Sequence, residues 1–115
     1  MTDEEATALG KRLVACKGFR PMRGMLDMQG RTWDASLLWR WSSDVDVPDL
    51  RDPATLGCVL EMVREAYDCS TCFAMWDESE EDWSLNVPHE GGGSYIESTA
   101  DSEAEALVAA LEAAP

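Results

Sequence analysis

Apolar residues recur every three or four positions in three segments of the chain, which is the spacing of an amphipathic helix. Thr2, Asp52 and Ser102 precede these segments, and each is a residue type that caps helix N-termini. Gly10 lies inside the first segment and is expected to weaken that helix by about 1 kcal/mol relative to Ala. The predicted helices run from Thr2 to Cys16, from Asp52 and Pro53 through Val63, and from Ser102 to Ala114.

Elsewhere the apolar period changes to two, or apolar residues become continuous, and both patterns are typical of β-strands. The run Cys69 to Trp76 is continuously apolar towards its end and predicts a strand buried on both faces. The best alternation places Trp33, Trp39 and Trp41 on one strand face. The predicted strands are Gly24 to Gln29, Arg31 to Ser42, Cys69 to Trp76, Asp82 to Val87 and Ser94 to Ser98, with residues 44–52 as a connector.

This order of elements, α-β-β-α-β-β-β-α, predicts an α+β fold in which three helices pack on an antiparallel sheet of about five strands. The length of 115 residues is close to the commonest domain size. A hydrophobic content of 45% and five tryptophans argue against disorder. We therefore expect residues 1–115 to form a single folded α+β domain.

The charge is distributed unevenly between the two halves of the chain. Residues 65–115 contain thirteen acidic side chains and no Lys or Arg, whereas residues 1–64 contain ten acids and nine bases. Almost all of the net charge of −14 therefore belongs to the C-terminal half. Such a half repels nucleic acid and anionic lipid, so direct binding to either is not expected.

No segment approaches the roughly 20 apolar residues that span a bilayer, and the N-terminus is acidic, unlike the basic start of a signal peptide. These features predict a soluble protein that stays in the cytoplasm.

Four short segments give the chain a family resemblance. They are residues 47–50 (VPDL), 52–58 (DPATLGC), 63–67 (VREAY) and 105–114 (EALVAALEAA). Together they resemble a set of small, acidic, uncharacterised proteins encoded by tailed phages and prophages, although the strands between them are not matched. The resemblance implies a phage accessory protein that acts in the cytoplasm of the infected bacterium. Phage proteins of this size and charge include inhibitors of host defence, among them anti-CRISPR proteins.

Cys69 and Cys72 have the spacing of a redox pair or of half a zinc site. A thioredoxin-like pair opens a helix, however, and this pair follows one. A zinc site needs two further ligands, and Cys16, Cys58 and His89 do not supply a second pair at ligand spacing. We therefore predict structural thiols and no disulfide in a reducing cytoplasm.

Other polar motifs also fall short of a chemical site. His89, the single histidine, lies beside three glycines in a loop unsuited to general-base geometry. Residues 44–49 resemble a calcium loop but lack its Gly and distal Glu. No catalytic, cofactor-binding or metal-binding residue is predicted, and we expect the protein not to be an enzyme.

An acidic run between two tryptophans, Trp76 and Trp83, is the strongest candidate for a contact surface. Its carboxylates can face water, the basic segment from Lys11 to Arg23, or a partner. We predict that it binds a basic, nucleic-acid-handling surface of a host defence protein, with a CRISPR effector subunit as one candidate partner. The alternative is a phage structural or packaging accessory protein whose acid is only solubilising. The predicted contact residues are Asp77, Glu78, Glu80, Glu81, Asp82, Trp83 and Glu90.

Overall fold

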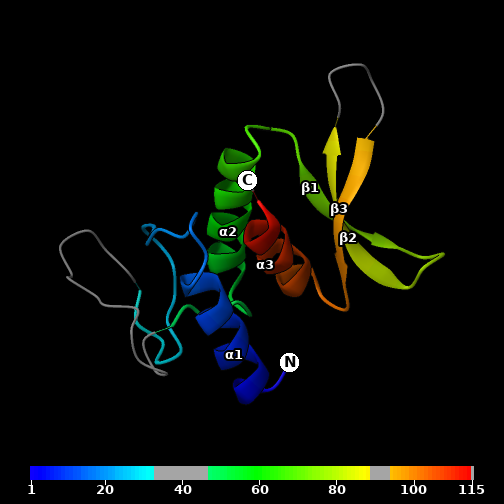
Figure 1. Cartoon of the computed structure of the whole chain (residues 1–115). Coiled ribbons are helices and arrows are strands. Elements are labelled where there is room, and N and C mark those ends of the chain that lie inside the picture. The colour runs from blue at the N-terminus through cyan, green and yellow to red at the C-terminus, as the bar shows by residue number, and fades with distance from the viewer. Residues whose placement is uncertain (33–46, 89–93, 115) are drawn as a thin grey trace.

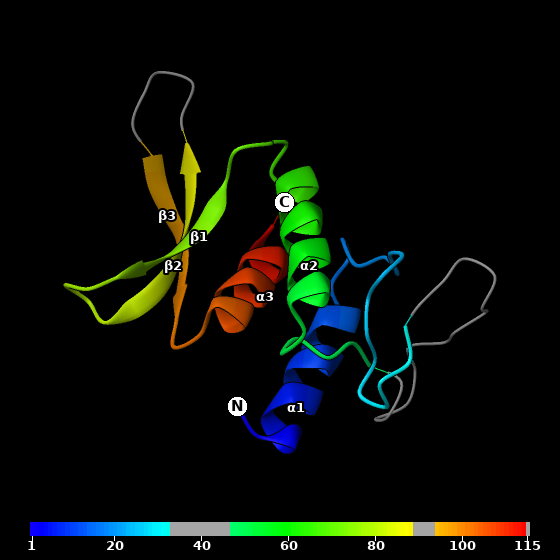
Figure 2. The same cartoon turned by 180° about the vertical axis from the view of Figure 1, so that it is seen from behind.

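The computed structural model describes residues 1–32, 47–88 and 94–114, and its architecture is α+β, as predicted (Figure 1). The strands form an antiparallel sheet in the order β1-β2-β3. All three helices lie on one side of this sheet, with α3 between the sheet and α2 (Figures 1 and 2). The elements are α1 (Asp3–Val14), α2 (Pro53–Ala66), β1 (Phe73–Asp77), β2 (Asp82–Pro88), β3 (Ser94–Ala100) and α3 (Glu103–Ala113).

The three predicted helices are confirmed, and each begins at the predicted cap. In every case the side-chain oxygen of the cap accepts a hydrogen bond from the backbone N–H three residues later, which satisfies one of the unpaired donors of the first turn. The pairs are Thr2 with Glu5 at 3.1 Å, Asp52 with Thr55 at 2.9 Å and Ser102 with Glu105 at 3.1 Å.

The core forms around α3, which contacts α1, α2 and all three strands. The sequence predicts one apolar stripe on this helix, but Ala106 and Ala110 are buried as well, so its buried surface is wider than that stripe. The hydroxyl of Tyr67 donates a 2.8 Å hydrogen bond to the carbonyl of Ala110 and fastens the end of α2 to α3. Other fully or nearly fully buried side chains are Leu13, Met25, Leu50, Val59, Met62, Val63, Leu85, Leu107 and Val108.

The prediction of a five-stranded sheet is wrong, because the described residues form three strands. Gly24 to Gln29 makes only isolated bridges, through Leu26 and Asp27, and no strand. The reason is the buried carboxylate of Asp27, whose Oδ1 accepts the backbone N–H of Gln29 and of Arg31 and closes a turn. Most of the predicted strand from Arg31 to Ser42, with its three tryptophans, lies outside the described residues.

The prediction that the Cys69 to Trp76 strand is buried on both faces is also wrong. β1 is an edge strand, and Phe73, Met75 and Trp76 are 43%, 43% and 44% exposed. Ala74 points to the helix side and packs against the core, whereas Phe73 and Met75 alternate to the other face, which no described element covers. The sheet therefore has one buried and one open face at this edge.

Gly10 is unfavourable for a helix by propensity, but the packing of α1 requires it. A Cβ atom at this position would lie 2.6 Å from the carbonyl oxygen of Pro48 and 2.9 Å from Cγ2 of Val47. These contacts are far shorter than van der Waals distances, so only glycine lets α1 approach the segment at residues 47–48. Gly57 in α2 differs, because a Cβ there would meet nothing within 4 Å.

This contrast predicts opposite effects for the same substitution. Gly57→Ala should stabilise the protein by about 0.5–1 kcal/mol through helix propensity and reduced unfolded-state entropy. Gly10→Ala should destabilise it by about 1–3 kcal/mol, because the overpacked contact outweighs the gain in propensity. Urea unfolding followed by circular dichroism measures both, and a shift of the two midpoints in the same direction would contradict the close approach at Gly10.

Among the described residues, no helix has both the length and the apolar character that a membrane crossing requires.

Candidate protein-binding surface

The predicted acidic run forms the turn of the β1–β2 hairpin, which projects beyond the helices (Figure 1). Asp77 and Asp82 close this turn as directly opposed partners, with residues 78–81 between them. Oδ1 of Asp77 accepts hydrogen bonds from the hydroxyl of Ser79 at 2.6 Å and from its backbone N–H at 2.9 Å. Glu81 adopts a left-handed backbone with φ of 53°. The acidic side chains therefore sit on an ordered turn.

The carboxylates of this turn have no cationic partner among the described residues. Glu78, Glu80 and Glu81 are exposed, and Asp77 and Asp82 are half-buried. The opposed pair Asp77 and Asp82 brings like charges together across the strands, which disfavours the hairpin slightly. The hydrogen bonds from Ser79 act in the other direction and lower the pKa of Asp77, so this carboxyl stays ionised. The turn is thus a concentrated, uncompensated negative charge.

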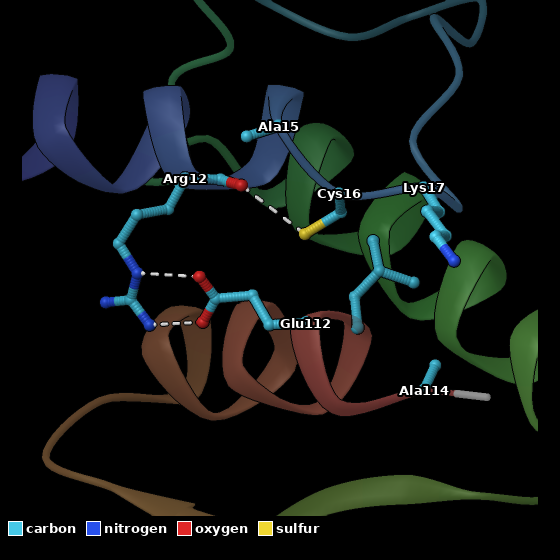
Figure 3. A pocket seen from close by; sticks show the side chains of 7 residues that line it. Arg12, Ala15, Cys16, Lys17, Glu112 and Ala114 are labelled. Carbon is cyan, nitrogen blue, oxygen red and sulfur yellow. Dashed lines mark hydrogen bonds and ion pairs between the residues drawn. The ribbon is translucent and has the colours of Figure 1, made fainter.

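The basic segment from Lys11 to Arg23 makes ion pairs elsewhere. The guanidinium of Arg12 binds Glu112 of α3 through two hydrogen bonds, of 2.6 and 3.2 Å (Figure 3). It also lies 3.7 Å from Glu105. Arg20 pairs with Glu65 at the end of α2. These contacts neutralise acids on α2 and α3 and none on the hairpin turn.

Aromatic side chains stand at the base of the acidic turn. Trp76 and Trp83 are direct cross-strand partners, with ring centroids 6.1 Å apart and planes inclined at 64°. Such an edge-to-face pair stiffens the hairpin. Trp83 is half-buried, whereas Trp76 is 44% exposed, so Trp76 is the more accessible of the two.

The structure brings together six of the seven predicted contact residues, those from Asp77 to Trp83. The seventh, Glu90, lies outside the described residues, as does His89. Sequence reasoning named Trp76 beside the acidic run but missed two further exposed apolar side chains, Phe73 and Met75, as part of this surface. Their apolar run gives no signal of exposure, because a fully buried strand has the same composition.

A shallow pocket of about 290 Å³ lies between the C-terminal ends of α1 and α3 (Figure 3). Cys16 lines this pocket, and its thiol donates a 3.3 Å hydrogen bond to the carbonyl of Arg12. Burial and the nearby carboxylate of Glu112 raise the pKa of Cys16, which keeps the thiol protonated and unreactive. Nor do the described residues contain three His, Cys, Asp or Glu side chains grouped to hold a metal ion.

No protein-family model, no curated protein and no solved structure matches this chain. The resemblance to phage proteins, and the function that it implies, accordingly remain predictions.

The Arg12–Glu112 pair predicts a pH-dependent contribution to stability. The guanidinium holds the pKa of Glu112 below its ordinary value of about 4.3. A lowered folded-state pKa stabilises the protein above the unfolded-state pKa, and this stabilisation is lost as the pH falls through the folded-state value. Because both side chains are about 40% exposed, Glu112→Gln should lower the free energy of unfolding at pH 7 by at most about 1 kcal/mol.

The difference should shrink as the pH is lowered from 7 to 3, because the wild-type carboxyl is increasingly protonated as the pH falls towards its folded-state pKa. Glu61→Gln on the exposed face of α2 serves as the control, since Glu61 has no ion pair among the described residues. Urea unfolding at both pH values measures the effect. An equal difference at pH 7 and pH 3 would show that the charge of Glu112 is not the cause.

Proposed function

We propose that this protein is a non-enzymatic inhibitor that binds a basic, nucleic-acid-handling surface of a host defence protein through its β1–β2 hairpin. The observation that carries the proposal is the projecting turn with five carboxylates, none of which pairs with a cation in the described residues. Acids elsewhere in the fold, such as Glu65 and Glu112, pair with arginines, whereas this turn gathers five uncompensated carboxylates within six residues.

The shape of the turn suits a groove. A two-stranded hairpin is narrow enough to enter a channel that binds nucleic acid, and carboxylates there replace phosphates as partners of Lys and Arg. Duplex DNA carries one charge per about 1.7 Å along its axis, so a partner groove built for it is densely basic. Charge complementarity of this kind raises the association rate and excludes partners of the wrong sign.

Trp76 adds a contact that charge alone does not provide. Its exposed ring lies at the end of β1, directly beside the acidic turn. Arginine guanidinium groups stack on tryptophan faces and also pair with carboxylates, so one Arg-rich groove satisfies both features. Aromatic side chains surrounded by polar residues are frequent anchors of protein interfaces.

The bacterial setting rests on the resemblance of roughly residues 47–67 and 99–115 to phage proteins. In that setting the partner is a host protein that handles nucleic acid, and a CRISPR effector subunit is one such protein.

Neutral, isosteric substitutions test the surface without removing the turn, because Asn at position 77 still accepts the Ser79 hydrogen bonds.

The test is affinity capture from bacterial lysate at low and high salt, with mass spectrometry of the eluted proteins. The hairpin variant carries Asp→Asn or Glu→Gln at residues 77, 78, 80, 81 and 82. The amount of partner protein that it captures should be at least about tenfold lower than for the wild type, as expected when several phosphate-like contacts disappear. A matched variant loses the same five charges elsewhere, at Glu4, Glu61, Asp68, Asp101 and Glu103, and should capture the same proteins as the wild type.

Equal capture by wild type and hairpin variant would exclude the turn as the binding surface. Equal loss in both variants would show that only net charge matters. Circular dichroism of both variants verifies that each remains folded.

A second candidate function, a phage structural or packaging accessory protein, is favoured by one observation. β1 is a sheet edge that exposes Phe73 and Met75 on its open face, and exposed edges pair with other strands. In that case the protein self-associates or enters virions, and salt has no effect. Sedimentation at 0.1 and 1 M salt tests self-association: Met75→Lys should abolish a salt-insensitive oligomer, whereas a wild-type monomer at every concentration would exclude pairing of two copies through this edge.

A further inference from the structure

Two thiols lie at the junction between α2 and β1, outside the hairpin turn. Cys69 follows the end of α2 and Cys72 immediately precedes β1. Arg64, in the last turn of α2, holds both backbones: its carbonyl accepts the N–H of Cys69 at 2.9 Å, and its Nε donates to the carbonyl of Cys72 at 3.0 Å. Asp68 has a left-handed backbone, with φ of 50°, so the chain turns sharply between the end of α2 and Cys69. The two cysteines are therefore fixed against the same residue.

The turn between the cysteines places their Cα atoms at a separation that a disulfide can span. Ser70 and Thr71 form a turn, so Cys69 and Cys72 occupy its first and fourth positions. Those positions of a β-turn have Cα atoms less than about 7 Å apart. A disulfide needs about 4.4–6.8 Å, so the two cysteines can be bridged with little backbone movement.

The two thiols differ in accessibility and in acidity. Cys69 is partly exposed, with its sulfur 3.6 Å from the hydroxyl oxygen of Thr71, whereas Cys72 is completely buried. The hydroxyl and backbone N–H of Thr71 lower the pKa of Cys69, and burial raises the pKa of Cys72. The turn thus supplies the hydrogen-bond donors that a helix N-terminus supplies in a thioredoxin-like pair.

We propose that Cys69 and Cys72 form a reversible disulfide by exchange with low-molecular-weight disulfides of the glutathione type, with Cys69 as the attacking thiol. This site departs from the structural role expected of the pair from its sequence position. It also stands independently of the hairpin surface, because no acidic residue of the turn takes part in it.

The exchange proceeds in two balanced steps. The Cys69 thiolate attacks one sulfur of oxidised glutathione, the S–S bond of the oxidant breaks, and one glutathione leaves as a thiolate that takes up a proton. Cys72 then loses its proton to solvent and attacks the Cys69 sulfur of the mixed disulfide, which releases the second glutathione. Two electrons pass from the cysteine pair to the oxidant, and one disulfide replaces another.

The sequence provides a convenient assay. No Lys or Arg follows Arg64, so trypsin releases residues 65–115 as one peptide that contains Cys69 and Cys72 and no other cysteine. The folded, reduced protein is equilibrated in a series of glutathione redox buffers, quenched with acid, alkylated and digested. We expect this peptide to lose two hydrogens as the buffer becomes more oxidising, and to recover them on return to reducing buffer.

Single variants separate the two roles. Cys72→Ser should stop at one glutathione adduct on Cys69, whereas Cys69→Ser should leave the peptide reduced and without adduct. In brief alkylation of the folded wild type, Cys69 should react at least about tenfold faster than Cys72, as its larger thiolate fraction and exposure require. Cys58→Ser is the matched control and should oxidise like the wild type, because burial raises the pKa of Cys58.

Three results would overturn the proposal. The first is a 65–115 peptide that stays reduced in every buffer, and the second is a disulfide between two protein molecules instead of one within this peptide. The third is alkylation of Cys16 and Cys58 as fast as that of Cys69. Circular dichroism of each variant confirms that a loss of reaction is not a loss of folding.

Discussion

The structure depends on the burial of α3. This helix is short, yet six of its eleven residues are buried, because it contacts both other helices on one side and the sheet on the other. A helix that is apolar over most of its circumference needs partners around it, unlike a surface helix with one apolar stripe. Ala104, Ala106 and Ala110 permit close approach of these neighbours, and Leu107, Val108 and Leu111 fill the space between them. Each of those larger side chains contributes about 1.5–3 kcal/mol by its burial.

The position of α3 also determines where charge is left uncompensated. Glu105 and Glu112 project from α3 towards Arg12 of α1, so these acids are partly neutralised where the helices meet. The hairpin turn extends past α3, and among the described residues no Lys or Arg reaches it. The same arrangement leaves one face of β1 open, since the helices cover only the other face (Figures 1 and 2). The acidic and the apolar parts of the exposed hairpin therefore have one architectural cause.

Local signals explain what the sequence could predict. Helix starts depend on a cap and the turn that follows it, so Thr2, Asp52 and Ser102 located all three helices. The acidic contact residues are contiguous, and a hairpin turn necessarily keeps contiguous residues together. The errors have two causes. The exposure of Phe73 depends on which elements cover the sheet, which is a matter of long-range packing. The turn at Asp27 is local, because the buried side chain accepts the backbone N–H groups of Gln29 and Arg31, and an alternating pattern does not show this. The ion pairs of Arg12 and Arg20 join residues 45 to 100 positions apart, which no local pattern encodes.

β1 connects the acidic hairpin turn with the pair Cys69 and Cys72. The thiol pair lies before its first residue and the acidic turn begins at its last, so the two are separated by five strand residues, or about 17 Å. Charges interact over only about 8 Å in physiological salt, so oxidation of the thiols does not change the electrostatic field at the turn appreciably. Any influence of one on the other must pass through the backbone of β1. Because β1 pairs along its whole length with β2, and Ala74 and Leu85 hold that ladder against the core, the strand resists a change of register at either end. The hairpin surface and the thiol pair are consequently separate features of one edge strand, and the loss of either leaves the physical basis of the other intact.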